Sequence, residues 1–165
     1  MSRVLRLFAA TGVAVALAIG AGTVSAYAST SGAHFFHDTA ASVDSSGALV
    51  VTIDEAGVGN ENVTYTLATN ATATYACING GGNHPKAANK ETFSQSLTGG
   101  GTFSPINGRI NASLSLGPIS AGTFRCPSGQ TLVLAAVSYS GIVLTDTTNG
   151  VTDNLGSASR TFFNV

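Results

Sequence analysis

Apolar and polar residues alternate along several stretches of the chain, with the two-residue period of a β-strand that buries one face. Leu49, Val51 and Ile53 form the first strongly apolar face of this kind. We therefore expect a protein built from strands. Further alternating runs place on one face Val63, Tyr65 and Leu67; Ala73, Tyr75 and Cys77; Phe93, Gln95 and Leu97; and Ile110, Ala112, Leu114 and Leu116.

Turn-forming residues separate these runs. Asn107-Gly108 and Asn149-Gly150 are typical of tight hairpins, because Asn and Gly both tolerate the positive φ that a type I′ turn requires. We expect the strands to be short, with a break at each such position. The other predicted breaks are Ser45-Ser46-Gly47, Asn70, Gly99-Gly100-Gly101 and Gly117-Pro118.

The last part of the chain continues the strand pattern. Residues Leu132 to Val137 are apolar on both faces, which predicts a central strand covered on each side, and Ile142 to Leu144 predict another strand. No segment has the 3.6-residue apolar period of a helix. The expected fold is an antiparallel, Ig-like β-sandwich of about eight to ten strands. "Ig-like" describes the architecture only, because the chain has no Trp to pack against a central disulfide.

Aromatic pairs lie at both ends of the predicted fold. Phe35 and Phe36 belong to the first, edge strand, and Phe162 and Phe163 point to opposite faces of the last one. We expect core and sheet-edge packing for these rings. The alternative is an exposed apolar patch, which would favour self-association.

The N-terminus has the pattern of an export signal. Arg3 and Arg6 precede an apolar run, and Ala26-Tyr27-Ala28 matches a cleavage site. Residues 1–28 are therefore predicted to be a signal peptide, although cleavage after Ala26 is an alternative. Residues 29–165 would form a single domain that is secreted, extracellular and not attached to the membrane.

Charge is sparse in the predicted mature chain. Seven Lys and Arg fall to five without Arg3 and Arg6, against eight Asp and Glu. No basic cluster is present, so a nucleic-acid partner is not expected. Ser and Thr supply 34 of the 137 mature residues and replace charge as the source of solubility.

The sequence contains two cysteines, Cys77 and Cys126. In an exported chain such a pair predicts one disulfide. Cys77 closes an alternating run, whereas Pro127 and a Ser-Gly turn follow Cys126. We therefore expect the bond to join a strand end to a loop.

The segment from Asn79 to Lys90 lacks periodicity and contains three consecutive glycines, which predicts a long loop directly after Cys77. Long polar loops on rigid folds often make binding contacts. We expect any contact to an anionic or carbohydrate ligand here; the alternative is an ordinary solvated loop. The candidate side chains are Asn83, His84, Lys86, Asn89 and Lys90.

His34, His37 and Asp38 form a small cluster that suggests a metal. Positions three apart on a strand face opposite ways, so the spacing suits one metal ion poorly. Cleavage after Ser31-Gly32-Ala33 would instead make His34 the N-terminal residue, as in copper-dependent polysaccharide monooxygenases. We keep that enzyme class as an alternative, and expect no cofactor otherwise.

Other catalytic patterns are weak. The chain has no G-x-S-x-G motif. Asp54 and Glu55 are adjacent on a strand and must diverge, so they do not predict a glycosidase pair. Asp146, Asn149 and Asp153 lack the spacing of a calcium loop.

Several stretches together resemble an uncharacterised family of small secreted proteins from actinobacteria of the Streptomyces type. The resemblance implies an actinobacterial origin and an extracellular location, and it carries no catalytic residues. The stretches are residues 47–59, 73–90, 126–130, 137–139, 145–150 and 160–165.

The function expected from these observations is a non-catalytic binding or structural role at the cell exterior, with an unknown protein or carbohydrate ligand. Two alternatives stand beside it. One is the copper enzyme with His34 at its N-terminus, and the other is a secreted inhibitor or competition factor that uses the loop from Gly80 to Lys90.

Overall fold

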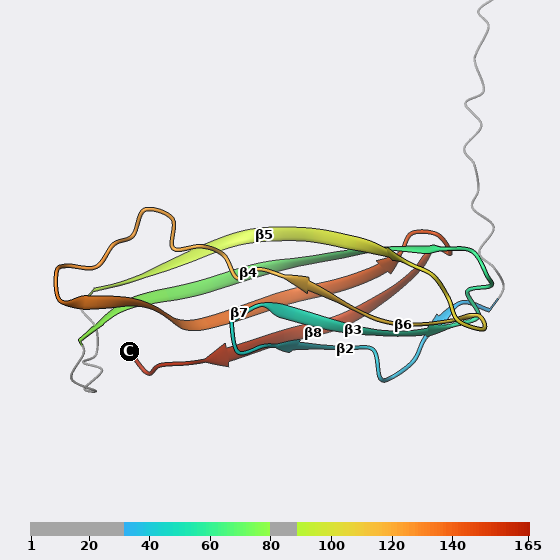
Figure 1. Ribbon diagram of the computed structural model, residues 1–165, viewed down its shortest axis with the longest axis horizontal. Helices are drawn as coiled ribbons and strands as arrows, with labels where there is room; N and C mark the ends of the chain where they lie inside the picture. Colours follow the sequence, from blue (N-terminus) through green and yellow to red (C-terminus); the bar gives the residue numbers. More distant parts are fainter. Residues whose placement is uncertain (1–31, 80–88) are drawn as a thin grey trace, which may run out of the picture.

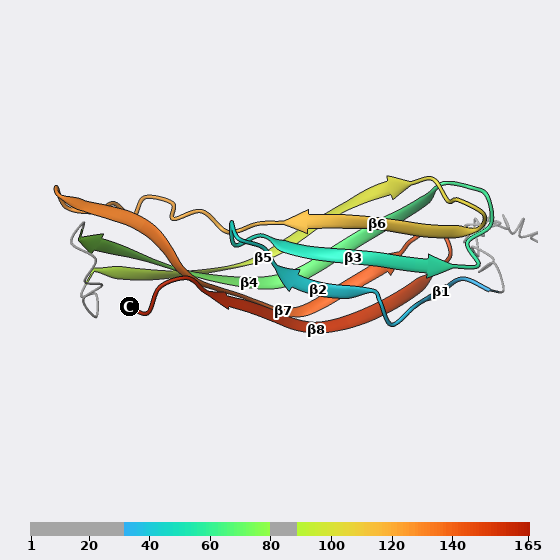
Figure 2. The same ribbon diagram turned by 60° about the horizontal axis from the view of Figure 1, so that its bottom comes forward.

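The computed structural model describes residues 32–79 and 89–165, and every regular element in these two ranges is a β-strand. None of the described residues forms a helix able to cross a membrane. The strands make two antiparallel sheets packed face to face (Figures 1 and 2). Sheet A contains β1 (His34–Phe35), β2 (Ala40–Val43), β3 (Leu49–Ala56) and β6 (Arg109–Leu116); sheet B contains β4 (Val63–Asn79), β5 (Lys90–Phe103), β7 (Gln130–Asp146) and β8 (Val151–Thr161).

All strand pairs are antiparallel. In sheet A, β3 pairs with β6 along one edge and with β1 and β2 in turn along the other. In sheet B the order is β5-β4-β7-β8. The predicted all-β sandwich is confirmed, with a strand count at the lower end of the expected range.

The core lies between the sheets and is made by the predicted alternating faces. Leu49, Val51 and Ile53 of β3 are at most 2% exposed, and Val63, Tyr65 and Leu67 of β4 are at most 1% exposed. Their neighbours along each strand point outward because successive side chains alternate. The hydrophobic pattern therefore determines which face of each sheet is buried.

The predicted hairpin at Asn107-Gly108 is confirmed, with φ angles of 52° and 74°. Gly150, with φ of 74°, turns the chain between β7 and β8. The predicted breaks at Ser45-Ser46-Gly47 and Gly117-Pro118 also lie between strands.

The prediction of a turn at Asn70 is wrong. Residue 70 lies inside β4, paired on one side with Ser96 and on the other with Ser140. Its side-chain Oδ1 accepts a hydrogen bond from Ser96 Oγ at 2.8 Å, so the amide bonds across the sheet instead of closing a turn. The separate strands predicted on either side of Gly141 are likewise one strand, β7, because an irregularity between Ser140 and Ile142 absorbs the glycine.

The prediction that the three glycines 99–101 end a strand is also wrong, because they lie within β5. Gly99 and Gly101 let the two sheets approach. A Cβ atom on Gly99 would lie 2.4 Å from Leu116 Cδ2, and one on Gly101 would lie 3.1 Å from Leu114 Cδ2. Glycine is needed here for space, because leucines of β6 occupy the volume that side chains of β5 would take.

Replacement of Gly99 by Val should therefore destabilise the protein by about 1–3 kcal/mol, as expected for overpacking. Urea unfolding measures the change. Thr98→Val on the exposed face of the same strand is the matched control and should shift stability by less than about 0.5 kcal/mol. Equal effects of the two substitutions would contradict this role of Gly99.

The chain end packs on both faces of sheet B. Phe162 joins the main core, whereas Phe163 packs against buried Ala76 and Ala135, so the predicted opposite orientation of the two rings is confirmed. The prediction that Leu132 to Val137 is buried on both faces is only partly confirmed, because Leu132, Val133 and Leu134 are half-buried. Phe35 packs against the main core near Tyr65, as expected for sheet-edge packing.

Candidate functional site

Sheet B extends beyond sheet A at one end. β4 and β7 have 17 residues each, whereas no strand of sheet A exceeds 8. Figures 1 and 2 show that the far ends of β4, β5 and β7 continue past β2, β3 and β6. The segment between β6 and β7 runs along this end, and we call the whole region the projecting end.

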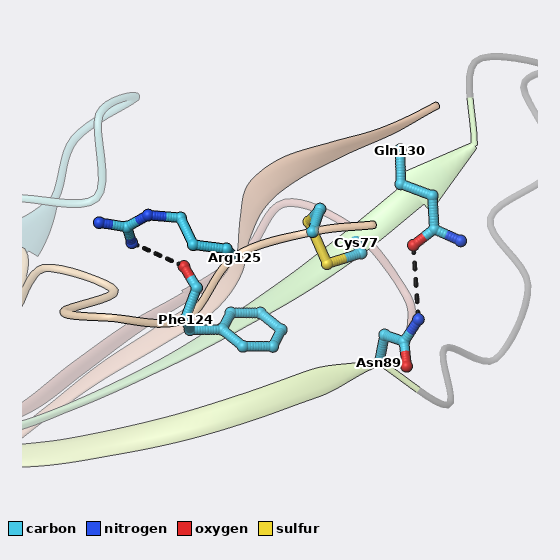
Figure 3. Close-up of a disulfide and its surroundings, with 6 residues drawn as sticks. Cys77, Asn89, Phe124, Arg125 and Gln130 are labelled. Carbon is cyan, nitrogen blue, oxygen red and sulfur yellow. Dashed lines mark hydrogen bonds between the residues drawn. A yellow bond between two sulfur atoms is a disulfide. The ribbon is translucent and has the colours of Figure 1, made fainter. Parts of the chain in front are cut away.

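The predicted disulfide lies in the projecting end. Cys77 near the end of β4 is bonded to Cys126 in the segment before β7, with 5.5 Å between the Cα atoms (Figure 3). The strand-to-loop connection is confirmed. Cys77 is only 3% exposed. A disulfide is compatible with an extracellular location.

Aromatic packing and a hydrogen bond hold the connecting segment to the sheet. Tyr75 of β4 donates from its hydroxyl to the carbonyl of Ile119 at 2.6 Å. Its ring packs edge-on against Phe93 of β5, with centroids 6.2 Å apart. The projecting end thus has its own cover where sheet A stops, which the alternating pattern could not indicate.

Two of the predicted loop residues are described, and both are tied to neighbouring segments. Asn89 accepts a backbone hydrogen bond from Cys77 at 3.0 Å, and its side-chain amide donates to Gln130 Oε1 at 3.5 Å (Figure 3). Lys90 Nζ donates to the Val165 carbonyl oxygen at 3.3 Å. Asn83, His84 and Lys86 lie outside the described residues.

The outer face of sheet B is covered by short polar side chains. Cross-strand pairs of hydroxyls lie 3.1 Å apart between Thr72 and Ser94 and 3.0 Å apart between Thr74 and Thr92. The register places further Ser and Thr of β7 and β8 in the same rows. These hydroxyl side chains meet only because strands far apart in sequence become neighbours. The sequence alone could therefore show only that each strand has a Ser/Thr face.

Two adjoining cavities hollow this face. Cavities of about 210 Å³ and about 360 Å³ share Thr74, Ala136 and Thr161 in their linings. Phe163 and Lys90 line the larger one. We call the combined hollow the hydroxyl groove.

Asp54 and Glu55 diverge as expected. Asp54 faces outward, where Arg109 Nε donates to its Oδ1 at 2.7 Å, and this hydrogen bond lowers the pKa of Asp54. Glu55 faces inward, is completely buried, and accepts a hydrogen bond from the Tyr65 hydroxyl at 2.6 Å. The arrangement does not bring the two carboxyls together.

Glu55 instead meets a carboxyl that sequence reasoning did not pair with it. Burial raises the pKa of Glu55 to about 7, and the nearby Asp146 adds to this rise against the opposing effect of Tyr65. Asp146 is also fully buried. Its Oδ1 accepts from the backbone N–H groups of Thr148 and Asn149 at 2.7 and 2.9 Å, and its Oδ2 accepts from the Asn149 amide at 2.6 Å. Asp146 thus organises the β7–β8 turn.

His34 and His37 have different neighbours. His34 Nδ1 lies 2.6 Å from the Gly32 carbonyl oxygen. His37 Nε2 lies 3.2 Å from Asp38 Oδ1, and both of those side chains are largely exposed. Within residues 32–79 and 89–165, no group of three or more His, Cys, Asp or Glu side chains could hold a metal ion.

Comparison with known proteins yields no relative: no protein-family model, no curated protein and no solved structure matches this chain.

Proposed function

We propose that this chain is a secreted, non-catalytic protein that binds a ligand at the cell exterior, as one of the small Ig-like secreted proteins of actinobacteria. The N-terminal pattern of Arg3, Arg6 and Ala26-Tyr27-Ala28 supports export. An oxidising exterior also suits the Cys77–Cys126 bond.

The observation that carries the binding role is the disulfide-braced projecting end. The main core is already closed between the two sheets, so β4, β5 and β7 do not need to extend past sheet A for its burial. The extension is nevertheless fixed by a disulfide and by its own cover. A rigid projecting surface keeps the entropy loss on binding low, which favours recognition.

The test is saturable binding of the exported protein to isolated cell envelopes. Protein collected from the medium should bind with a measurable plateau, and replacement of Asn89 and Lys90 by Ala should weaken this binding. Both side chains are exposed on the projecting end. Glu61→Ala, an exposed change in the segment before β4, is the control and should leave binding unchanged.

Retention inside the cell, or purely non-saturable binding, would contradict the proposal. Mass spectrometry of the same exported protein locates its N-terminus. A start at Ser29 supports the proposal, whereas a start at His34 with bound copper would favour the enzyme alternative.

A further inference from the structure

The outer face of sheet B is unusual in having no charged side chain across its central rows. Roughly 25% of residues are charged in a typical soluble domain, against 9% in this chain. The outward-facing residues of β4 in this region are Thr66, Ala68, Asn70, Thr72 and Thr74. These residues and their partners on β5, β7 and β8 are all Ser, Thr or Asn, except Ala68, Gly100, Ala136 and Val143. Such a face is polar but carries no charge that would favour an anionic or a cationic ligand.

Its hydroxyls are held in place by their neighbours. Besides the pairs at Thr72 and Thr74, Thr145 and Thr152 lie 3.3 Å apart, and Ser96 bonds to Asn70. Each Ser or Thr hydroxyl can donate one hydrogen bond and accept two, so a paired hydroxyl keeps capacity for a ligand. Adjacent strands lie about 4.8 Å apart, so the hydroxyls within each row across the sheet form a regular array.

The hydroxyl groove is the hollow part of this array. In the row that contains Thr92, Thr74 and Thr161, residue 136 is alanine, and the missing side-chain atoms leave a depression at the place where the two cavities meet. The half-buried ring of Phe163 lies at the larger cavity. The groove therefore has the small side chain of Ala136 at its base, hydroxyl groups along its sides and one aromatic side chain, that of Phe163.

We propose that the hydroxyl groove binds a segment of a neutral polysaccharide, an inference that rests on the proposed binding function. Sugar hydroxyls both donate and accept hydrogen bonds, as do the Ser and Thr side chains that line the groove. The aromatic side chain offers an apolar surface to a sugar ring. An uncharged ligand matches this lining, because Lys90, its only charged side chain among the described residues, already donates to Val165.

A second copy of the chain fits this surface less well. Stable protein interfaces have an apolar, well-packed centre, whereas pairing two hydroxyl faces would bury mainly polar groups. The depression at Ala136 would also leave a gap between two such faces. A polymer of sugar rings can enter the depression and follow it across the strands.

Affinity electrophoresis provides the test, with soluble β-glucan, dextran and galactomannan as neutral probes and polygalacturonate as an anionic one. At least one neutral probe should retard the wild-type protein more than polygalacturonate does. Thr161→Lys, which blocks the groove, should raise the dissociation constant about tenfold. The matched control is Thr152→Lys, the same change on the same face of β8 outside both cavities, and it should stay within about twofold.

Ala136→Gln fills the depression without adding charge and should also weaken retardation. Failure of every neutral probe to retard the wild type, a preference for polygalacturonate, or equal losses in the two Lys variants would overturn the inference. Self-association that Thr161→Lys abolishes, seen by sedimentation, would instead assign the groove to a second copy.

The envelope-binding assay separates this inference from the proposed function. If Thr161→Lys keeps wild-type binding to envelopes, the inference that the hydroxyl groove binds the ligand is wrong, and the proposed binding function stands. If the wild type does not bind envelopes, the proposed function fails independently of any polysaccharide result.

Discussion

Removal of the Cys77–Cys126 disulfide should lower the free energy of unfolding by about 4 kcal/mol. The bond closes a loop of 49 residues, and the chain-entropy model gives this value for a loop of that length. The corresponding fall in melting temperature is roughly 15 °C for a domain of this size. The variant to use is the double substitution Cys77→Ser with Cys126→Ser, because a single one leaves a reactive thiol.

Thermal unfolding followed by circular dichroism measures the shift. The wild-type protein treated with a thiol reductant should fall to the stability of the double variant, while the reductant should not affect the variant. Two titratable thiols in the native, unreduced protein would show that the bond does not form. An unchanged melting temperature would show that the loop is constrained by other contacts.

The protein should become less stable as the pH rises through neutrality, because of Glu55. Its pKa is raised from 4.5 to about 7 in the folded protein, so the folded state holds this proton more tightly than the unfolded chain. The stabilisation is complete below pH 4.5 and is lost as the pH rises through about 7. The total is about 3 kcal/mol over this interval.

The surroundings of Glu55 explain why its carboxyl keeps its proton in the folded protein. Among the described residues, Glu55 Oε1 has no hydrogen-bond donor, although it is buried. Hydrogen bonding with the Asp146 side chain also favours the protonated form of Glu55, and the oxygens of Asp146 already accept from Thr148 and Asn149. Ionisation of Glu55 above neutral pH would place a negative charge in the core beside Asp146, which is strongly unfavourable without a compensating cation.

Urea unfolding at a series of pH values tests this prediction. Glu55→Gln keeps the shape and stays neutral, so it should flatten the decline and make the variant more stable than the wild type at alkaline pH. Tyr65→Phe removes the donor to Glu55 Oε2; it should cost about 1–3 kcal/mol and move the decline to higher pH. A wild-type profile that is flat between acid and neutral pH would contradict the assignment.

The candidate sites differ in how far sequence could lead to them. The disulfide followed from two cysteines and an export pattern, and its strand-to-loop character followed from Pro127. The hydroxyl groove did not follow, because it depends on Thr74 meeting Ala136, and Ala136 meeting Thr161, across three strands. Strand order and register bring these residues together, and neither is visible in a one-dimensional pattern.

Some turn-forming residues were interpreted correctly from the sequence and others were not. Asn107-Gly108 was interpreted correctly because the turn conformation is a property of those two residues alone. Asn70 and Gly99-Gly100-Gly101 were not, because their roles depend on partners: a hydroxyl on β5 for Asn70, and the leucines of β6 for Gly99 and Gly101. A residue that suits a turn also suits a strand when its neighbour supplies the hydrogen bond or needs the space.

By itself, the sequence determined the strand class, the buried faces of β3, β4, β5 and β6, the tight hairpin at Asn107-Gly108 and the pairing of Cys77 with Cys126. These depend on side-chain alternation, on backbone preferences and on there being only two cysteines. The tertiary structure alone decided the projecting end, the uncharged hydroxyl face and the burial of Glu55 beside Asp146. Each of these depends on which distant strands become neighbours, because packing brings together groups that local preferences cannot relate.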